Sequence, residues 1–128
     1  MDAKTHLKAL LDSYDACALE CDGMTRVLHT VLSAQQILHQ VVVGRIAHAP
    51  TCLAIEPHFW IKVPSCNGQD LRVDYRARLW LGDREDVPHG VFAASDSFAV
   101  EYSGRVVEMS VLDSTVFEWL TGGMAYPI

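Results

Sequence analysis

The apolar residues of this chain change their spacing near residue 38, and this change constrains the fold more than any other feature. Between residues 22 and 37 they recur at helical intervals, the most regular helix signal in the sequence. From His39 onward, most apolar runs are short and β-branched, with polar or turn residues at their ends, as in strands. We therefore predict a helix that begins at about Asp22 and leads into a mainly β region. The helical stripe consists of Met24, Val27, Leu28, Val31, Leu32 and Ile37.

Two further helices are predicted, one before this helix and one after the β region. Apolar residues at helical spacing follow Thr5, which we expect to cap a first helix that ends before Cys21. Ser114 is expected to cap a last helix that stops at Gly122 and Gly123. This order predicts an α+β fold with a mostly antiparallel sheet, in a single domain spanning residues 1–128. The predicted strands are residues 39–46, 57–63, 70–81, 98–102 and 105–111.

The amino-acid composition indicates which cellular compartment and which binding partners to expect. Sixteen acidic and ten basic residues give a net charge of −6, which argues against binding to nucleic acid or to an anionic membrane surface. No stretch approaches the roughly 20 apolar residues that span a bilayer, and residues 1–6 do not begin a signal peptide. We expect a cytoplasmic protein with reduced cysteines. The four cysteines form no C-x-x-C pair, so we expect no metal site, and we expect no cofactor.

A hairpin is predicted where two β-type runs flank a turn-rich segment around Cys66. Pairing the two runs symmetrically about Cys66 places His58 opposite Asp74. The same register places Trp60 opposite Arg72, and Lys62 opposite Asp70. Directly opposed side chains have Cβ atoms about 4.5–5.5 Å apart. We therefore expect Asp74 to accept a hydrogen bond from His58 and to orient its imidazole as a base.

An oriented imidazole activates a nucleophile, and a thiol at a helix N-terminus is well suited to that role. Cys21 stands where the second predicted helix begins. Cys17 lies a turn earlier, Cys52 lies in a connecting segment, and Cys66 lies at the predicted hairpin tip, facing away. Cys21 is therefore the predicted nucleophile, with His58 as its base.

Together these segments resemble the transglutaminase-like, papain-related cysteine enzymes. Members carry a cysteine followed by an amphipathic helix and a hydrophobic strand that ends in glycine, and Cys21 with the run ending at Gly44 is similar to that block. They next carry a His-aromatic-Trp strand and then an aspartate, as in His58-Phe59-Trp60 and Val73-Asp74. The resemblance implies a papain/transglutaminase-like core, with the cysteine at a helix start packed on the sheet. It also implies a Cys21-His58-Asp74 catalytic triad.

The chemistry of such a triad is acyl transfer, which leaves several functions open. Release of the acyl group to water makes the protein a cysteine hydrolase, namely a peptidase, amidase or deamidase. Capture of the acyl group by an amine makes it a transglutaminase-type or other acyltransferase. A binding module that keeps the fold without turnover is the alternative from another class. We predict the hydrolase, acting on a peptide, a protein or a small amide.

Four further residues are candidates for substrate binding. Alternation along the predicted strand 70–81 places Arg76 and Trp80 on one face, where they could form a substrate wall with Trp60. The same alternation also describes an ordinary solvated face. His89, in the loop that follows, is a candidate for lining a pocket.

Overall fold

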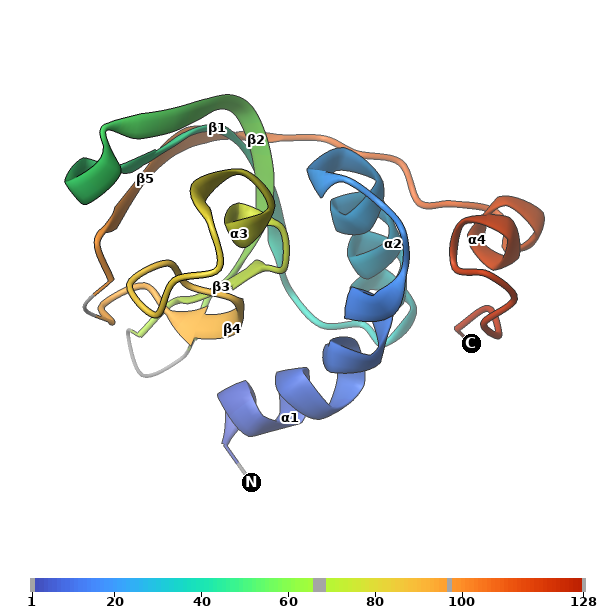
Figure 1. Ribbon diagram of the computed structural model, residues 1–128. Coiled ribbons are helices and arrows are strands. Elements are labelled where there is room, and N and C mark those ends of the chain that lie inside the picture. The colour runs from blue at the N-terminus through green and yellow to red at the C-terminus, as the bar shows by residue number, and fades with distance from the viewer. Residues whose placement is uncertain (1, 66–68, 97, 128) are drawn as a thin grey trace.

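The computed structural model is an α+β fold in which helices cover one five-stranded antiparallel sheet (Figure 1). It describes residues 2–65, 69–96 and 98–127. Across the sheet the strands follow the order β4-β3-β2-β1-β5, and every neighbouring pair is antiparallel. The strands are β1 (Gln40–His48), β2 (Leu53–Val63), β3 (Leu71–Asp74), β4 (Gly90–Ala93) and β5 (Val100–Val107), and the α-helices are α1 (Ala3–Leu11), α2 (Cys21–Ala34), α3 (Ala77–Leu81) and α4 (Ser114–Leu120).

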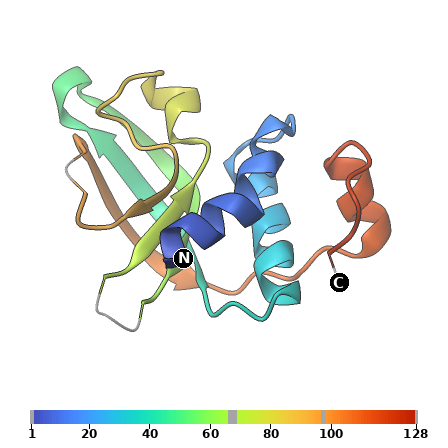
Figure 2. The same ribbon diagram turned by 90° about the horizontal axis from the view of Figure 1, so that it is seen from below.

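Helix α2 is the centre of the helical layer. It packs against β2 on one side and α4 on the other, while α1 packs against β4. Figure 2 shows α2 between the sheet and α4. The predicted stripe accounts for this position, because most of it is buried and faces the sheet. The main core therefore lies between α2 and the face of the sheet that carries Val41, Ile61, Val63, Leu71 and Val73.

A second, smaller core lies on the opposite face of the sheet. Successive strand residues point to opposite faces, so Val42 and Trp60 leave the main core and join α3 instead. Ala77 and Leu81, four residues apart on α3, bury their side chains there. His58 and Asp74 alternate in step with Trp60 and Arg72, which places the imidazole–carboxylate pair on this second face.

Several predicted elements are wrong in their extent, and the strand predicted over residues 57–63 already begins at Leu53. The strand predicted over residues 70–81 ends at Asp74, and Ala77–Leu81 is α3, because Ala77 and Leu81 have a helical spacing that buries both. The strands predicted over 98–102 and 105–111 are one strand, β5, which continues through Gly104. Strand β4 was not predicted. The cap residues also differ, since Asp2 and Asp113 cap α1 and α4 in place of Thr5 and Ser114.

The predicted hairpin exists, but its register is shifted by two residues. Val63 pairs with Leu71, and Lys62 lies opposite Arg72 rather than Asp70. A shift of two keeps every side chain on its predicted face, so the polar and apolar pattern is satisfied equally well by both registers. Residues 66–68, where the predicted hairpin centre Cys66 falls, lie outside the described residues.

Strands β1 and β5 approach closely where Gly44 faces Gly104. A Cβ at Gly44 would overlap the carbonyl oxygen of Ser103 and the Cα of Gly104. A Cβ at Gly104 would come within 2.9 Å of the Trp60 ring and within 2.5 Å of the Val43 carbonyl oxygen. The glycine that ends the apolar run Val41, Val42 and Val43 is therefore explained by strand packing.

Gly44→Ala should destabilise the protein, because the obstructing atoms belong to backbone and cannot rotate away. We expect a loss of at least about 1–3 kcal/mol in the free energy of unfolding, measured by urea denaturation. Gly23→Ala is the matched control. Gly23 lies in α2, and its added methyl would only touch the Leu19 side chain at 3.4 Å, so helix propensity should make that variant neutral or more stable. Equal free energies of unfolding for Gly44→Ala and Gly23→Ala would show that the close approach of β1 and β5 does not require glycine at position 44.

Candidate active site

The position of His58 follows from where the neighbouring strands end. On one side it pairs with Gly44 of β1, next to a β-bulge between Gly44 and Ile46. On the other side β3 ends at Asp74, before it reaches the level of His58. The edge of β2 is therefore uncovered by a strand at His58. The side chain is nonetheless completely buried, and the start of α2 is near enough to act on its ring.

His58 and Asp74 form a buried hydrogen bond. The imidazole Nε2 lies 2.7 Å from Asp74 Oδ2, so the predicted contact between these side chains is confirmed. The predicted direct opposition is wrong, because the shifted register makes the pair diagonal, and the bond spans that diagonal. Asp74 Oδ2 also accepts a 2.8 Å bond from the Tyr102 hydroxyl, and Oδ1 accepts a 3.0 Å bond from the Arg76 backbone N–H.

The three bonds to Asp74 fix the tautomer of His58. A carboxylate only accepts hydrogen bonds, so Nε2 must carry the proton that it shares with Asp74. The other ring nitrogen, Nδ1, is then the one with a free lone pair in the neutral ring. Nδ1 is buried and has no well-aligned hydrogen-bond partner among the described residues. In the protonated ring, Nδ1 is the nitrogen that carries the second proton.

Cys21 is the group that acts on the ring besides Asp74. It is the first residue of α2, is partly exposed, and follows Glu20, whose side chain makes no capping bond. Burial lowers the pKa of His58, but the Asp74 hydrogen bond, the neighbouring Cys21 side chain and the charge of both outweigh it. They raise the pKa to about 9. At neutral pH, His58 is therefore predominantly an imidazolium between a carboxylate and a sulfur.

Arg76 connects Asp74 with the segment that leads to Cys21. Its backbone N–H holds Asp74, while its guanidinium reaches the segment that leads into α2. Nη2 donates to the carbonyl oxygens of Asp15 and Cys17 at 3.0 and 2.8 Å, and Nε donates to that of Leu19 at 2.5 Å. Nη1 forms a 2.6 Å ion pair with the Asp15 carboxylate. Arg76 thus fixes the approach to Cys21 and does not stand on a strand face as predicted.

The other candidates for substrate binding lie in different surroundings. Trp60 is buried, stacks on His58 at a centroid distance of 6.2 Å, and meets the Tyr102 ring edge-on. Trp80 is exposed on α3, so its predicted place on a strand face is wrong. His89 bonds the Asp15 carboxylate at 2.7 Å. Contact of these three residues with a substrate stays a prediction.

Sequence reasoning missed the part played by Tyr102 and by the guanidinium of Arg76. Tyr102 comes from β5, and which strand lies beside β1 is not readable from the chain. Burial and the adjacent Asp74 carboxylate raise the pKa of Tyr102 well above its ordinary value, so its hydroxyl stays a donor. The sequence around an arginine that follows a strand does not indicate which carbonyl groups its guanidinium will contact.

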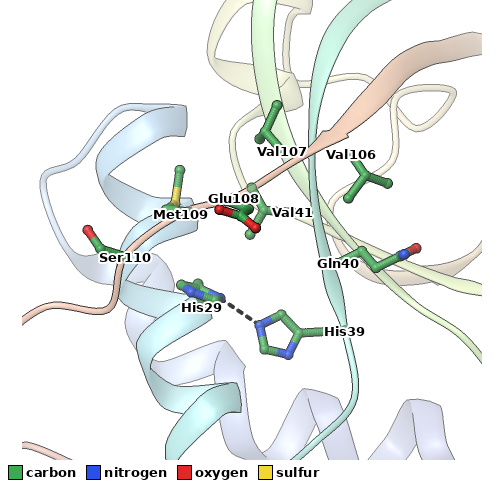
Figure 3. A pocket seen from close by; sticks show the side chains of 9 residues that line it. All are labelled: His29, His39, Gln40, Val41, Val106, Val107, Glu108, Met109 and Ser110. Atoms are coloured by element: carbon green, nitrogen blue, oxygen red, sulfur yellow. Dashed lines mark hydrogen bonds between the residues drawn. The ribbon is translucent and has the colours of Figure 1, made fainter.

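A pocket of about 500 Å³ lies between α2, β1 and β5 (Figure 3), and its lining does not include Cys21, His58 or Asp74. His29 and His39 meet at its edge, with Nδ1 of His29 2.7 Å from Nε2 of His39. Burial and the neighbouring His39 lower the pKa of His29. Among the described residues, no three potential metal ligands gather anywhere. None of the described helices has the length and apolar character needed to cross a bilayer.

Comparison with known proteins gives no family. No protein family matches the chain, and no curated protein or solved structure is significantly similar to it. The resemblance to transglutaminase-like enzymes therefore stays a prediction.

Arg76→Lys should loosen the segment that leads into Cys21, because a single ammonium cannot reproduce the planar fork of a guanidinium. We expect the free energy of unfolding to fall by about 1–3 kcal/mol and amide hydrogen exchange at residues 17–20 to accelerate. Arg78→Lys is the control, since Arg78 bonds Val87 and Asp83 and does not touch this segment. Unchanged amide hydrogen exchange at residues 17–20 in Arg76→Lys would show that Arg76 does not hold this segment in place.

Proposed function

We propose that this protein is a thiol-dependent acyl-transfer enzyme, a cysteine hydrolase that cleaves amide bonds through Cys21, His58 and Asp74. The observation that carries the proposal is the buried imidazole of His58. One nitrogen is held by Asp74, the other has no well-aligned hydrogen-bond partner among the described residues, and Cys21 lies close enough to raise the pKa of the ring. A purely structural histidine at full burial normally satisfies both nitrogens.

The proposed reaction begins from an ion pair of the Cys21 thiolate with the His58 imidazolium, in which Nδ1 of His58 holds the proton that Cys21 has given up. The thiolate attacks the acyl carbon of the substrate, and the imidazolium then gives its proton to the leaving amine. The products of this half-reaction are a thioester on Cys21 and a free amine. Water, deprotonated by the neutral imidazole, hydrolyses the thioester and restores the Cys21 thiolate beside the His58 imidazolium. Asp74 keeps Nε2 protonated throughout and stabilises the imidazolium.

Stabilisation of the oxyanion falls to the backbone at the start of α2. The first N–H groups of a helix have no intrahelical partner. At the start of α2 the Glu20 side chain makes no capping bond, and Asp22 Oδ1 accepts from the Gly23 N–H at 2.8 Å. The Cys21 N–H lies on the nucleophile itself, where an oxyanion donor is most effective. The positive end of the helix dipole favours negative charge at the same point.

The proposal extends to the fold and the substrate class. A cysteine at the start of a helix that packs on an antiparallel sheet, with histidine and aspartate on adjacent strands, supports a papain/transglutaminase-like core. The substrate is a peptide, a protein or a small amide. We place hydrolysis before transfer to an amine because an acyltransferase needs a second, shielded site for the acceptor. A binding module without turnover has no need of the Asp74–His58–Cys21 series.

An active ester tests the acyl-transfer chemistry without knowledge of the substrate. Incubation with p-nitrophenyl acetate should release p-nitrophenolate, and the acetyl group should be found by peptide mass spectrometry on Cys21. Cys21→Ala should abolish the labelled peptide and reduce the rate by about 10³-fold or more. His58→Gln should reduce the rate by about 10²–10⁴-fold, because the general base is gone.

The matched control is Cys52→Ala, which removes an exposed cysteine outside the site and should change neither rate nor labelling. Added glycinamide separates the two enzyme classes, since faster turnover with formation of N-acetylglycinamide indicates transfer to an amine. Acetylation spread over all cysteines, or full activity of Cys21→Ala, would refute the proposed function.

A further inference from the structure

The register of the hairpin creates an uncommon charge arrangement on the second face of the sheet. Lys62 of β2 lies directly opposite Arg72 of β3. Directly opposed side chains project to the same face, and like charges in that position repel. Asp70 relieves one of the two by a 3.3 Å ion pair with Lys62. Within the described part of the chain, no carboxylate forms an ion pair with Arg72.

These residues line a pocket of about 250 Å³ that opens beside an aromatic wall. The rings of Trp60 and Tyr102 meet edge-on at 5.0 Å between centroids. The Arg72 guanidinium lies over the Tyr102 ring, 4.8 Å from its centroid. Gly104 also lines the pocket, and it offers no side chain to fill the space next to Trp60. The pocket therefore combines the Tyr102 side chain and the edge of the buried Trp60 ring with a guanidinium held in place by stacking.

The charge at this pocket opposes that of the whole molecule. Lys62 and Arg72 contribute two positive charges and Asp70 one negative charge, which leaves a net charge of +1 on a chain whose net charge is −6. A guanidinium has a planar fork of donors that matches a carboxylate. The volume lies below the 300–1,000 Å³ of most drug-sized ligand sites, so only a small group fits.

We propose that this pocket binds a small planar carboxylate, whose anionic group bridges Arg72 and Lys62 while its flat part lies beside Tyr102 and the edge of Trp60. The bound anion removes the repulsion between the two opposed cations. A free aromatic acid and the C-terminal carboxylate of a peptide ending in an aromatic residue share this chemistry. The site contains none of the triad residues, so the proposal goes beyond the acyl-transfer function and does not depend on it.

Benzoate is the probe, and benzamide is its neutral counterpart of the same shape. Binding is followed in the full chain by the NMR signals of the tryptophan indole N–H groups. Trp60 lines the pocket, whereas Trp119 is exposed on α4 and serves as a control within the molecule. Benzoate should shift the Trp60 signal saturably, with a dissociation constant of about 1 mM or below, and benzamide should not. Added salt should weaken the binding, because part of it is electrostatic.

Substitution of the two basic residues should weaken the binding of benzoate, and substitution of Asp70 should strengthen it. Arg72→Gln and Lys62→Gln should each raise the dissociation constant about tenfold, since each removes a charge-assisted contact. Asp70→Asn should lower it severalfold because it frees Lys62, a gain that a misfolded variant cannot produce. Arg45→Gln, which neutralises an exposed arginine of β1 outside the pocket, should leave it unchanged. Cys21→Ala should also bind benzoate normally, which separates this site from the proposed catalytic function.

N-acetylphenylalanine and its amide distinguish the two sources of the carboxylate. Tighter binding of N-acetylphenylalanine than of benzoate identifies a peptide C-terminus, and the reverse identifies a free aromatic acid. Either result requires that the amide fails to bind. The proposal is overturned if neither acid shifts the Trp60 signal, or if the shift is the same in Arg72→Gln, Lys62→Gln and Arg45→Gln.

Discussion

The site depends on the burial of one carboxylate. Asp74 is almost completely buried, and an ionised group away from water is stable only where hydrogen bonds replace its hydration. Its three donors come from β2, β5 and the turn after β3. Removal of one partner from a buried charged network typically costs about 3–5 kcal/mol. The carboxylate therefore requires these three parts of the chain to meet, and their meeting places His58 beside the start of α2.

The same requirement explains why β3 is short. After Asp74 the chain turns, so that the backbone of Arg76 can reach the carboxylate and its guanidinium can reach the segment before Cys21. One residue thereby holds Asp74 with its main chain and the segment that leads to Cys21 with its side chain. On the other side, the close crossing of Gly44 and Gly104 lets Trp60 lie flat beside His58. The residues that pack this part of the protein also position His58 and Asp74, so a substitution that disturbs the packing should also disturb the site.

The sequence was informative wherever a pattern was local. The helical stripe of α2 and the alternation in β2 placed Cys21 at a helix start and His58 on the same face as Asp74. The register of the β2–β3 hairpin was not determined, because a shift of two residues preserves every face. The segment 77–81 was misread since its apolar residues fit a short helix as well as a strand. Tyr102 was missed because its role depends on the order of strands in the sheet, which long-range packing decides.

The shifted register is also what brings Lys62 and Arg72 together, because the predicted register would have placed Lys62 opposite Asp70 and Arg72 opposite Trp60. Both sites share the Tyr102 side chain, whose hydroxyl bonds Asp74 and whose ring carries Arg72. The contacts thus run from Cys21 through His58, Asp74 and Tyr102 to the pocket.

The most direct test is an NMR titration of the His58 ring nitrogens. Burial alone would lower the pKa of His58, and the hydrogen bond and charges of Asp74 and Cys21 raise it to about 9. The account predicts an imidazolium that loses its proton near pH 9 in the unmodified protein. In Cys21→Ala the pKa should fall, because one of the groups that stabilise the cation is absent. A pKa at or below the ordinary value of about 6.5, or one that Cys21→Ala leaves unchanged, would contradict the account.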